Sequence, residues 1–359
     1  MTSRMNHGLR ELAQLAGVSK STASRVISGS GYASPEVRER VMRAAESLSY
    51  KPNAVARAMV TKRTNNIGVI VFREKLPIVS HPLYGTIIDE ILLASEARGY
   101  SVFLKTDKEM SLRSTDYMLE QRVDGLILVS RLRKNVIEYV KRFNIPYVMV
   151  NGSTEDPDVI HLVSNDEAGG GRAAEYLHGL GHRRFFVIAG PGEHRSHSLR
   201  LQGFTQRLEQ LGVSSSSDKV SIVPSPESSF ACGVRLMAEH YTAFRQGGYT
   251  ALFMTNDMLA LGALKFLLDM GVRIPEEAAV MGYDNIELGG MYSPGLSTVS
   301  VDASGIGRDA VEILDKLIQG EAGLPRLIEY ESEVIARQST SRQLTQGKER
   351  TTCCGIGNR

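Results

Sequence analysis

The most constraining feature of this sequence is a long alternation, from Ile67 onward, between short apolar runs and longer stretches with helical periodicity. The apolar runs are IGVIVF (67–72), YSVFLK (100–105), GLILVS (125–130), YVMV (147–150), FFVIAG (185–190), VSIV (220–223), ALFMT (251–255) and AVMGYD (279–284). Helical patterns separate most of them, at 84–98, 167–180, 198–211 and 258–270. Runs that are apolar on both faces are typical of parallel strands covered by helices on each side. The length of the region predicts two such sheets.

Residues 9–48 have a different pattern, which predicts three short helices. Apolar residues at i, i+3, i+4 and i+7 predict the first helix, which Gly17 ends: Leu9, Leu12, Ala13 and Ala16. Ser19 can cap a second helix, and Ser34 followed by Pro35 can begin a third. A glycine turn between the first two helices predicts a helix-turn-helix unit.

This helical segment is also the basic part of the chain. Residues 1–63 contain 11 Lys and Arg against 4 Asp and Glu, a net charge of +7, whereas the whole chain has +2. A small basic unit on an acidic body indicates a polyanionic partner, although a basic surface can also serve solubility alone.

The second helix of the segment has two unlike faces. Its apolar residues Ala23, Val26 and Ile27 cluster on one side, at about 100° per residue. Small hydroxyls and one guanidinium lie on the other side: Ser21, Arg25 and Ser28. Such a face can approach DNA closely, where an arginine can make a bidentate contact with guanine or grip a phosphate. A solvated polar face is the alternative.

The sequence excludes several classes of protein. Its apolar runs fall short of the roughly 18 to 20 residues of a membrane-spanning helix, and the N-terminus lacks the apolar core of a signal peptide. We therefore expect no membrane partner and a cytoplasmic, nucleoid-associated protein. Cys232, Cys353 and Cys354 form neither a disulfide framework nor a zinc spacing.

The motifs of common enzymes are incomplete. GPGEHR at 190–195 has Arg195 where a dinucleotide loop needs its third glycine, and MYSPG at 291–295 has Met291 where a nucleophile elbow needs glycine. His194 and His197, with Glu193, fall in a predicted loop with poor metal spacing. We expect no catalytic residues, cofactor or metal.

Several segments together resemble the LacI/GalR family of bacterial transcription repressors. They are LRELAQLAGVSKSTASRVISG, YKPNAVARAM, RTNNIGVIV, QRVDGLILVS, LGHRRFFVIAGP, RLQGF, TNDMLALGALKFLLDMGVRIP, VMGYDN and VIARQST. Their order and spacing extend the resemblance over residues 8 to 341. It implies a repressor that binds a near-palindromic operator in double-stranded DNA as a homodimer and has a small-molecule effector, a sugar or sugar phosphate. The sign of the effector's action stays open between inducer and corepressor.

The resemblance assigns DNA contacts to two segments. Lys20, Ser21 and Arg25 would face base edges, and hydroxyl residues would contact phosphates: Ser19, Thr22, Ser24, Ser28, Tyr32 and Ser34. A hinge helix would enter the minor groove with Asn53, Ala56, Arg57 and Met59. Met59 stands where the family usually has leucine as the wedge that opens the central base step.

For the effector, the resemblance implies a cleft with Arg200, Asn256 and Asp284 as contacts. A guanidinium can donate to neighbouring hydroxyls, a carboxylate accepts them, and an amide does either. Arg200 could instead pair with an acid on the cleft rim, and Asp284 could be a strand cap. Tyr84 lies in a loop that departs from the family pattern, and Phe230 could be either a stacking platform or part of the core.

The resemblance also implies the fold. We expect an all-α helix-turn-helix domain at 1–52, a hinge helix and linker at 53–66, and a type I periplasmic-binding-protein-like α/β domain at 67–341. The latter would comprise two doubly wound parallel-sheet subdomains, one of about 67–164 and 297–325, the other of about 165–296 and 326–341. Residues 342–359 lack periodicity and are expected to be a disordered tail. A solute-binding protein or a sugar-modifying enzyme without DNA function is the alternative.

Overall fold

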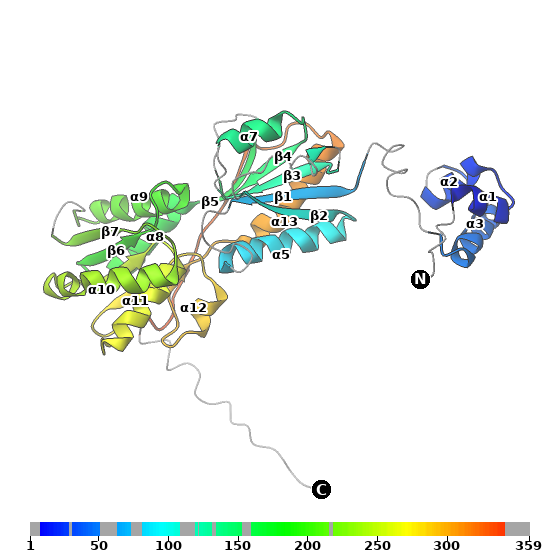
Figure 1. Cartoon of the computed structure of the whole chain (residues 1–359). Coiled ribbons are helices and arrows are strands. Elements are labelled where there is room, and N and C mark those ends of the chain that lie inside the picture. Colours follow the sequence, from blue (N-terminus) through cyan, green and yellow to red (C-terminus); the bar gives the residue numbers. More distant parts are fainter. Residues whose placement is uncertain are drawn as a thin grey trace, which may run out of the picture. The chain divides into compact units, whose positions relative to one another are not determined.

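A computed structural model describes residues 8–28, 31–50, 63–72, 81–107, 119–120, 122–130, 134–152, 159–214 and 218–341. The chain divides into two compact units, Met1–Asn65 and Asn66–Arg359 (Figure 1). Among the helices of the described ranges, none is long and apolar enough to cross a bilayer. The hinge residues Asn53, Ala56, Arg57 and Met59, and the expected tail at 342–359, lie outside those ranges.

The described residues of the first unit form three helices, as the sequence predicts. They are α1 (Leu9–Leu15), α2 (Lys20–Ser28) and α3 (Pro35–Ser47). Their buried core comprises Leu12, Ala16, Val26, Val41 and Ala44. The expected caps are present, because Ser19 Oγ accepts a hydrogen bond from the Thr22 amide at 3.1 Å and Ser34 caps α3 ahead of Pro35. This confirms the helix-turn-helix prediction.

The second unit begins with a six-stranded parallel sheet. Its strands, in spatial order, are β11 (Leu327–Tyr330), β5 (Ile160–Ser164), β4 (Tyr147–Val150), β3 (Gly125–Val129), β1 (Asn66–Phe72) and β2 (Ser101–Asp107). The helices of this lobe are α5 (Pro82–Ala97), α7 (Lys134–Lys141) and α13 (Ala303–Gln319). Figure 1 shows α5 and α13 together beside this sheet, with α7 apart from them.

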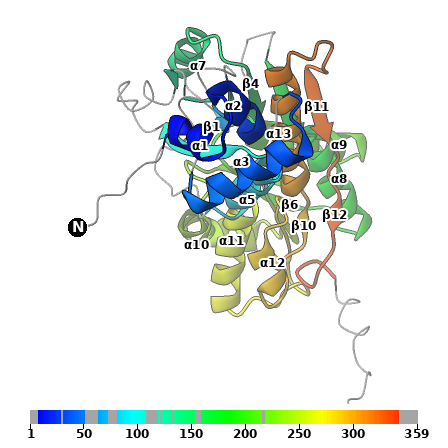
Figure 2. The ribbon, with the colours of Figure 1, turned by 90° about the vertical axis from the view of Figure 1, so that its right-hand side faces the viewer.

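A four-stranded parallel sheet forms the other lobe. Its order is β7 (Val220–Pro224), β6 (Phe185–Ala189), β8 (Ala251–Met254) and β9 (Ala279–Met281). Five helices belong to it: α8 (Asp166–Gly179), α9 (Arg195–Gln210), α10 (Phe230–Gln246), α11 (Asp257–Asp269) and α12 (Glu287–Met291). Figure 2 shows this lobe from the side, with α10, α11 and α12 at one end of the unit. Two parallel sheets with helices confirm the predicted α/β fold class.

Three crossing segments join the two lobes. The chain leaves the first sheet after β5, returns to it through β10 (Thr298–Val299) and α13, and leaves again after β11. β10 pairs with β12 (Val334–Ile335), an antiparallel ribbon between the sheets. β11 adds an edge strand to the first sheet, so the last crossing begins after Tyr330. The boundary expected from the sequence lay earlier, near residue 326.

Helices α8 and α9 approach each other closely through glycine. A Cβ built on Gly170 would lie 2.1 Å from the carbonyl oxygen of Arg200, and one on Gly203 would lie 1.9 Å from that of Glu167. Side chains at these two positions are excluded by the neighbouring backbone. The glycines thus allow the helix that contains Arg200 to lie directly against α8.

Candidate functional site

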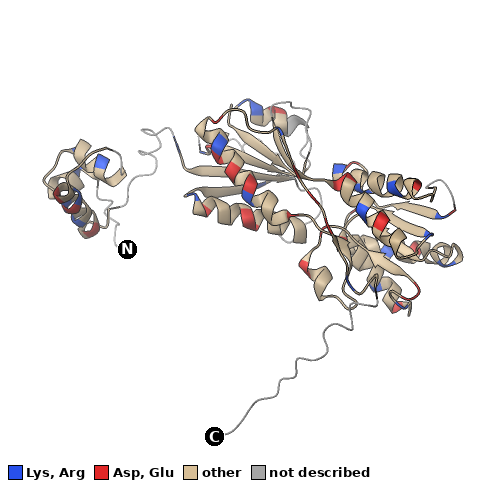
Figure 3. Ribbon diagram, turned by 180° about the vertical axis from the view of Figure 1, so that it is seen from behind, with Lys and Arg blue, Asp and Glu red and all other residues tan. Residues whose placement is uncertain are grey.

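The exposed face of α2 has the composition that its sequence predicts. Lys20, Ser21, Ser24, Arg25 and Ser28 are exposed, while Ala23 and Val26 are buried in the core of the unit. Charges of both signs occur on α3, as the ribbon in Figure 3 shows. Helix α2, in contrast, contains no acidic residue, in its first turn or elsewhere.

Arg25 is held at the exposed surface by local contacts. Its Nε donates to the carbonyl oxygen of Ser21 at 3.4 Å, and its side chain lies over Gly31, whose φ is +84°. Tyr32, the next residue, is 86% exposed. Arg25 is exposed, and within the described part of the unit no hydrogen bond engages its two terminal guanidinium nitrogens.

Four of the hydroxyls expected at phosphates, those of Ser19, Thr22, Ser28 and Ser34, already have partners within the unit. Ser19 Oγ lies 2.8 Å from both Ser21 Oγ and Thr22 Oγ1, in addition to its capping bond. Ser34 Oγ contacts Glu36 and the Val37 amide. Ser28 Oγ donates back to the carbonyl of Ser24. A hydroxyl that caps a helix can still accept or donate once more, so these contacts do not exclude a phosphate.

In the second unit, Arg200 lies at the centre of a buried ionic cluster. Its Nε donates to Asp166 Oδ1 and its Nη1 donates to Asp284 Oδ1, each at 2.8 Å. A second Nη1 bond goes to the carbonyl of Thr255, also at 2.8 Å. The guanidinium stacks on the Tyr283 ring, 3.8 Å from its centroid. Arg200 is only 2% exposed, so its acid partners are buried with it and not on the rim of a cleft.

The cluster leaves donors and acceptors unused. Among the described residues, no hydrogen bond reaches Nη2 of Arg200, and Asp166 Oδ2 is a buried acceptor without a partner. Buried polar atoms are rarely left unpaired in native proteins. The arrangement therefore offers two N–H donors and a carboxylate oxygen to a bound molecule.

Asp166 belongs to this cluster, although it is not among the effector contacts expected from the sequence. It follows β5 directly and begins α8, with Asn165 as the cap of the helix. A signal that could have found it is its position just past the carboxyl end of a parallel strand. The strand before it, β5, is not among the strands that the sequence predicts.

The charges of the cluster shift its pKa values. Burial raises the pKa of Asp284 to about 6, although the Arg200 guanidinium acts in the opposite direction. Burial by itself would lower the pKa of Arg200, but Asp166 and Asp284 outweigh it and hold that pKa above its ordinary value. The arginine stays charged, and Asp284 can exchange a proton near neutral pH.

The backbone of Asp284 has a conformation unusual for a non-glycine residue, with φ of +115°. Its amide donates to the carbonyl of Val299 at 2.8 Å. The next residues are held by Asp257, whose Oδ2 accepts from the Ile286 amide at 2.9 Å and whose Oδ1 accepts from Thr298. Asp284 is thus fixed on both sides, which answers the strand-cap alternative: its carboxylate points at Arg200.

Tyr84 brings the other lobe to the cluster. It lies in the first turn of α5, and its hydroxyl donates to Ser130 Oγ at 3.1 Å. Burial raises the pKa of Tyr84, the hydrogen bond to Ser130 lowers it, and Asp284 and Arg200 act on it through their charges. Tyr84 of the first lobe thus feels the charges of the cluster, and its contact with an effector stays a prediction.

Asn256 and Phe230 are placed differently. Asn256 caps α11: its Oδ1 accepts from the Leu259 amide at 3.0 Å, and its Nδ2 donates to the carbonyl of Ser228 at 3.2 Å. Both polar atoms of its amide have protein partners. Phe230 is half-buried and packs against the core of the second lobe. Among the described residues, no hydrogen bond joins either residue to Arg200, in contrast to Asp284, and their contacts with an effector stay predictions.

His197 is a buried residue of the second lobe that lies between Thr255 and Ser228. Contrary to the loop expected for it, it lies in α9 and is 8% exposed. Its Nδ1 is 2.8 Å from Thr255 Oγ1 and its Nε2 is 2.7 Å from Ser228 Oγ. Burial, then Arg200, holds its pKa well below the usual value, so the imidazole is neutral. No cluster of metal ligands occurs among the residues with described positions.

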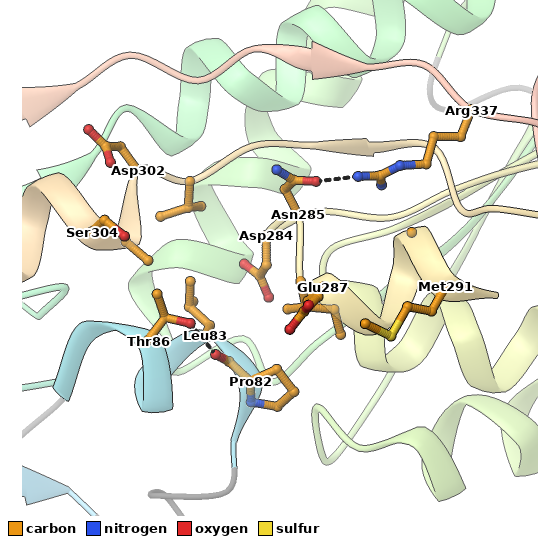
Figure 4. A pocket seen from close by; sticks show the side chains of 14 residues that line it. Pro82, Leu83, Thr86, Asp284, Asn285, Glu287, Met291, Asp302, Ser304 and Arg337 are labelled. Atoms are coloured by element: carbon orange, nitrogen blue, oxygen red, sulfur yellow. Dashed lines mark hydrogen bonds between the residues drawn. The ribbon is translucent and has the colours of Figure 1, made fainter. Parts of the chain in front are cut away.

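A cavity of about 550 Å³ adjoins Asp284. It is lined by both lobes: Pro82, Leu83, Thr86, Asp284, Asn285, Ile286, Glu287, Gly290, Met291, Val301, Asp302, Ala303, Ser304 and Arg337. Figure 4 shows Asp284 and Glu287 facing it from one wall and Thr86 and Leu83 from the opposite one, with Arg337 bonded to Asn285 at 2.8 Å. The two lobes thus enclose a polar cleft next to the ionic cluster.

A helix-turn-helix unit joined to a two-lobed α/β body with a polar cleft defines a ligand-responsive DNA-binding regulator. Residues 8–53 match the model of bacterial regulatory proteins of the lacI family, and residues 174–340 match a periplasmic binding protein-like domain. The chain belongs to the LacI family, and it is a transcriptional regulator, not an enzyme.

Relatives cover nearly the whole chain. The HTH-type transcriptional regulator CelR of Thermobifida fusca is 32% identical over 344 residues, 94% of this chain and 100% of the relative. The HTH-type transcriptional repressor PurR of Vibrio vulnificus (strain CMCP6) is 30% identical over 93% of this chain and 98% of its own length.

Solved structures agree with this family. A Lac repressor dimer bound to operator and the anti-inducer ONPF superposes with a TM-score of 0.80 at 26% identity, covering 93% of this chain and 99% of that one. A CelR–cellobiose complex superposes with a TM-score of 0.69 at 29% identity and the same coverage.

Proposed function

We propose that this protein is a cytoplasmic, nucleoid-associated repressor that binds a near-palindromic operator as a homodimer and responds to an uncharged sugar in its cleft. The observation on which the proposal rests is the Asp166–Arg200–Asp284 cluster, which is buried in the second lobe yet leaves donors and acceptors unused. The named relatives and the operator-bound Lac repressor dimer support the DNA function.

The DNA contact is assigned to α2. We propose that Lys20, Ser21 and Arg25 face base edges in the major groove, while hydroxyls around them contact phosphates, as the sequence predicts. The exposure of all three residues supports this assignment. The helix–turn–helix docks a second helix in this way, and a dimer places two such helices one helical turn of DNA apart.

The chemistry of the cleft favours a polyhydroxy compound over a phosphorylated one. Two carboxylates surround one guanidinium, and the adjoining cavity adds Glu287 and Asp302. A phosphate would meet a net negative charge there, whereas sugar hydroxyls can donate to carboxylates and accept from Arg200 Nη2. The cellobiose bound by a CelR relative fits this chemistry.

The same geometry suggests how ligand and operator are coupled. Arg200 and Asp284 lie in one lobe and Tyr84 in the other, so a ligand that touches all three changes the angle between the lobes. Coupling between two sites is typically about 1–3 kcal/mol, and it is reciprocal. The proposed boundaries are those expected from the sequence, with the last crossing placed after Tyr330.

Two measurements test the proposal. Gel shifts with a duplex library, at several salt concentrations, should give an operator whose affinity falls steeply with salt because phosphate contacts release counterions. Thermal shift with paired neutral and phosphorylated sugars should show stabilisation by a neutral member. An absence of any preferred duplex would contradict the repressor function, and stabilisation only by phosphorylated sugars would contradict the ligand class.

A further inference from the structure

A chain of hydroxyl groups lies directly beneath the ligand-facing arginine. Tyr283 stacks its ring against the Arg200 guanidinium at 3.8 Å, and its hydroxyl lies 3.2 Å from Ser332 Oγ. Ser332 Oγ in turn lies 2.9 Å from Ser164 Oγ. All three residues are buried, with exposures of 0% for Tyr283 and Ser332 and 2% for Ser164. Water is thus excluded from this chain of contacts.

Two of the three hydroxyls come from crossing segments, and the third comes from the second lobe. Ser164 ends β5 in the first crossing segment, and Ser332 lies in the last crossing, between β11 and β12. Tyr283 follows β9 and precedes Asp284, whose amide bonds to Val299 at the second crossing. The hydroxyl chain therefore joins the first and the last crossing below Arg200, and the Asp284 amide, next to Tyr283, bonds to the second.

The neighbouring helix is shaped around this point. A Cβ built on Gly169 of α8 would lie 2.0 Å from the Tyr283 hydroxyl and 3.1 Å from Cβ of Ser332. Only glycine leaves space there for the hydroxyl contact. The position of α8 against the crossings thus depends on the same three residues.

We propose that Tyr283 is a positioning residue that links ligand occupancy at Arg200 to the angle between the lobes. This inference rests on the proposed function of the cleft. The ring fixes the plane of the guanidinium, so that Nη2 faces the ligand. The hydroxyl joins that ring to the crossing segments, so that a shift of Arg200 changes the angle between the lobes.

The two parts of the side chain can be separated by substitution. Tyr283→Phe keeps the ring under Arg200 and removes the hydroxyl, Ser332→Ala removes the hydroxyl's partner, and Tyr283→Leu removes the ring. Tyr176→Phe is the matched control, because its hydroxyl bonds to Thr340 Oγ1 at 2.9 Å elsewhere on α8. Each variant is made in the full-length chain.

The first readout needs no ligand. Amide hydrogen exchange in the crossings, at the Asp284 and Ser300 amides that bond to Val299 and Glu333, should quicken at least fivefold in Tyr283→Phe and Ser332→Ala. Tyr176→Phe should leave it unchanged. Equal exchange in the wild type and both hinge variants would overturn the proposal, whether or not a sugar binds.

The second readout uses cellobiose, D-glucose and D-ribose as probes in operator-binding titrations. Tyr283→Phe should bind the responsive sugar within about threefold of the wild type, while the sugar's effect on operator affinity should fall at least fivefold. Tyr283→Leu should lose at least tenfold in sugar affinity. Full coupling in Tyr283→Phe would overturn the inference alone, whereas a wild type that responds to no sugar while exchange behaves as expected would count against the proposed function.

Discussion

The α-carbon of Gly170 faces the carbonyl oxygen of Arg200 at a distance that allows no side chain: a Cβ would lie 2.1 Å away. Gly170→Ala should therefore push α9 from α8 and displace Arg200, at a cost of about 1–3 kcal/mol in unfolding free energy. Urea denaturation measures this cost.

Gly171, one residue further on α8, supplies the control. Its Cβ would meet only ordinary contacts at 3.6 and 3.7 Å. Gly171→Ala should be neutral or stabilise the protein by up to about 1 kcal/mol, because alanine favours a helix over glycine. Equal loss of stability in both variants would show that the close contact at Gly170 is not the cause.

Removing Arg200 should be far more destabilising than neutralising one of its partners. Arg200→Met leaves the carboxylates of Asp166 and Asp284 buried without a counter-charge, which typically costs about 3–5 kcal/mol. Asp284→Asn keeps the Asp166–Arg200 pair and should cost less than half as much. Chemical denaturation of the two variants at pH 7 compares them, and a reversed order would refute the central role of the guanidinium.

Sugar binding should depend on pH through Asp284. Burial raises the pKa of this carboxyl to about 6, and only the ionised form can accept hydroxyl protons at both oxygens. Affinity should thus rise as pH increases from 5 to 7 and level off above. Isothermal titration calorimetry across this range tests the slope, with Asp284→Asn as the variant that should lose it.

The stability of the unit should also fall in acid, in this case through His197. Its pKa is well below the unfolded value of 6.5, mainly because of burial, so the unfolded chain binds a proton that the native one does not. The contribution of His197 is complete above pH 6.5 and is lost as pH falls below it. His197→Gln, which keeps a donor and an acceptor, should flatten this part of the pH–stability curve; an unchanged curve would speak against it.

Arg25 should decide which duplex is preferred. Arg25→Ala is expected to reduce discrimination at one base pair by about 1–3 kcal/mol, the worth of a bidentate contact to guanine. Arg43→Ala removes a charge from α3 that is paired with Glu39 at 3.4 Å, and serves as the control. Competition gel shifts with single-base operator variants distinguish the two. If Arg25→Ala still discriminates between the operator variants, another residue of α2 must contact the bases.

The sequence allowed the fold to be predicted where strands are continuous apolar runs. GLILV of β3 is buried at every position, which is why its pattern is unambiguous. β11, by contrast, alternates exposed and half-buried residues at the sheet edge, and β10 and β12 have two residues each. Such short or exposed strands are fixed by their neighbours and leave little local pattern.

The site could be predicted only in part for the same reason. Asp284 is expected from the resemblance at VMGYDN, whereas Asp166 lies outside the segments that carry the resemblance and follows β5, a strand that the sequence did not predict. The two acidic partners of Arg200 lie 34 and 84 residues away in the sequence. A repeating sequence pattern cannot reveal contacts between residues so far apart. Asn256 stays a prediction as an effector contact, and its bond to the Ser228 carbonyl, 28 residues away, is another contact that local sequence does not show.

The third crossing has a consequence for biosynthesis. Residues beyond β11 return to complete the far lobe, where the Ser339 carbonyl accepts from the Val280 amide at 2.9 Å and its hydroxyl accepts from the Ser297 amide at 2.8 Å. That lobe begins at α8 but cannot be finished until Ser339 has left the ribosome. Truncated products of translation would therefore present an incomplete lobe to the proteases of the cell, even when they already contain an intact DNA-reading unit.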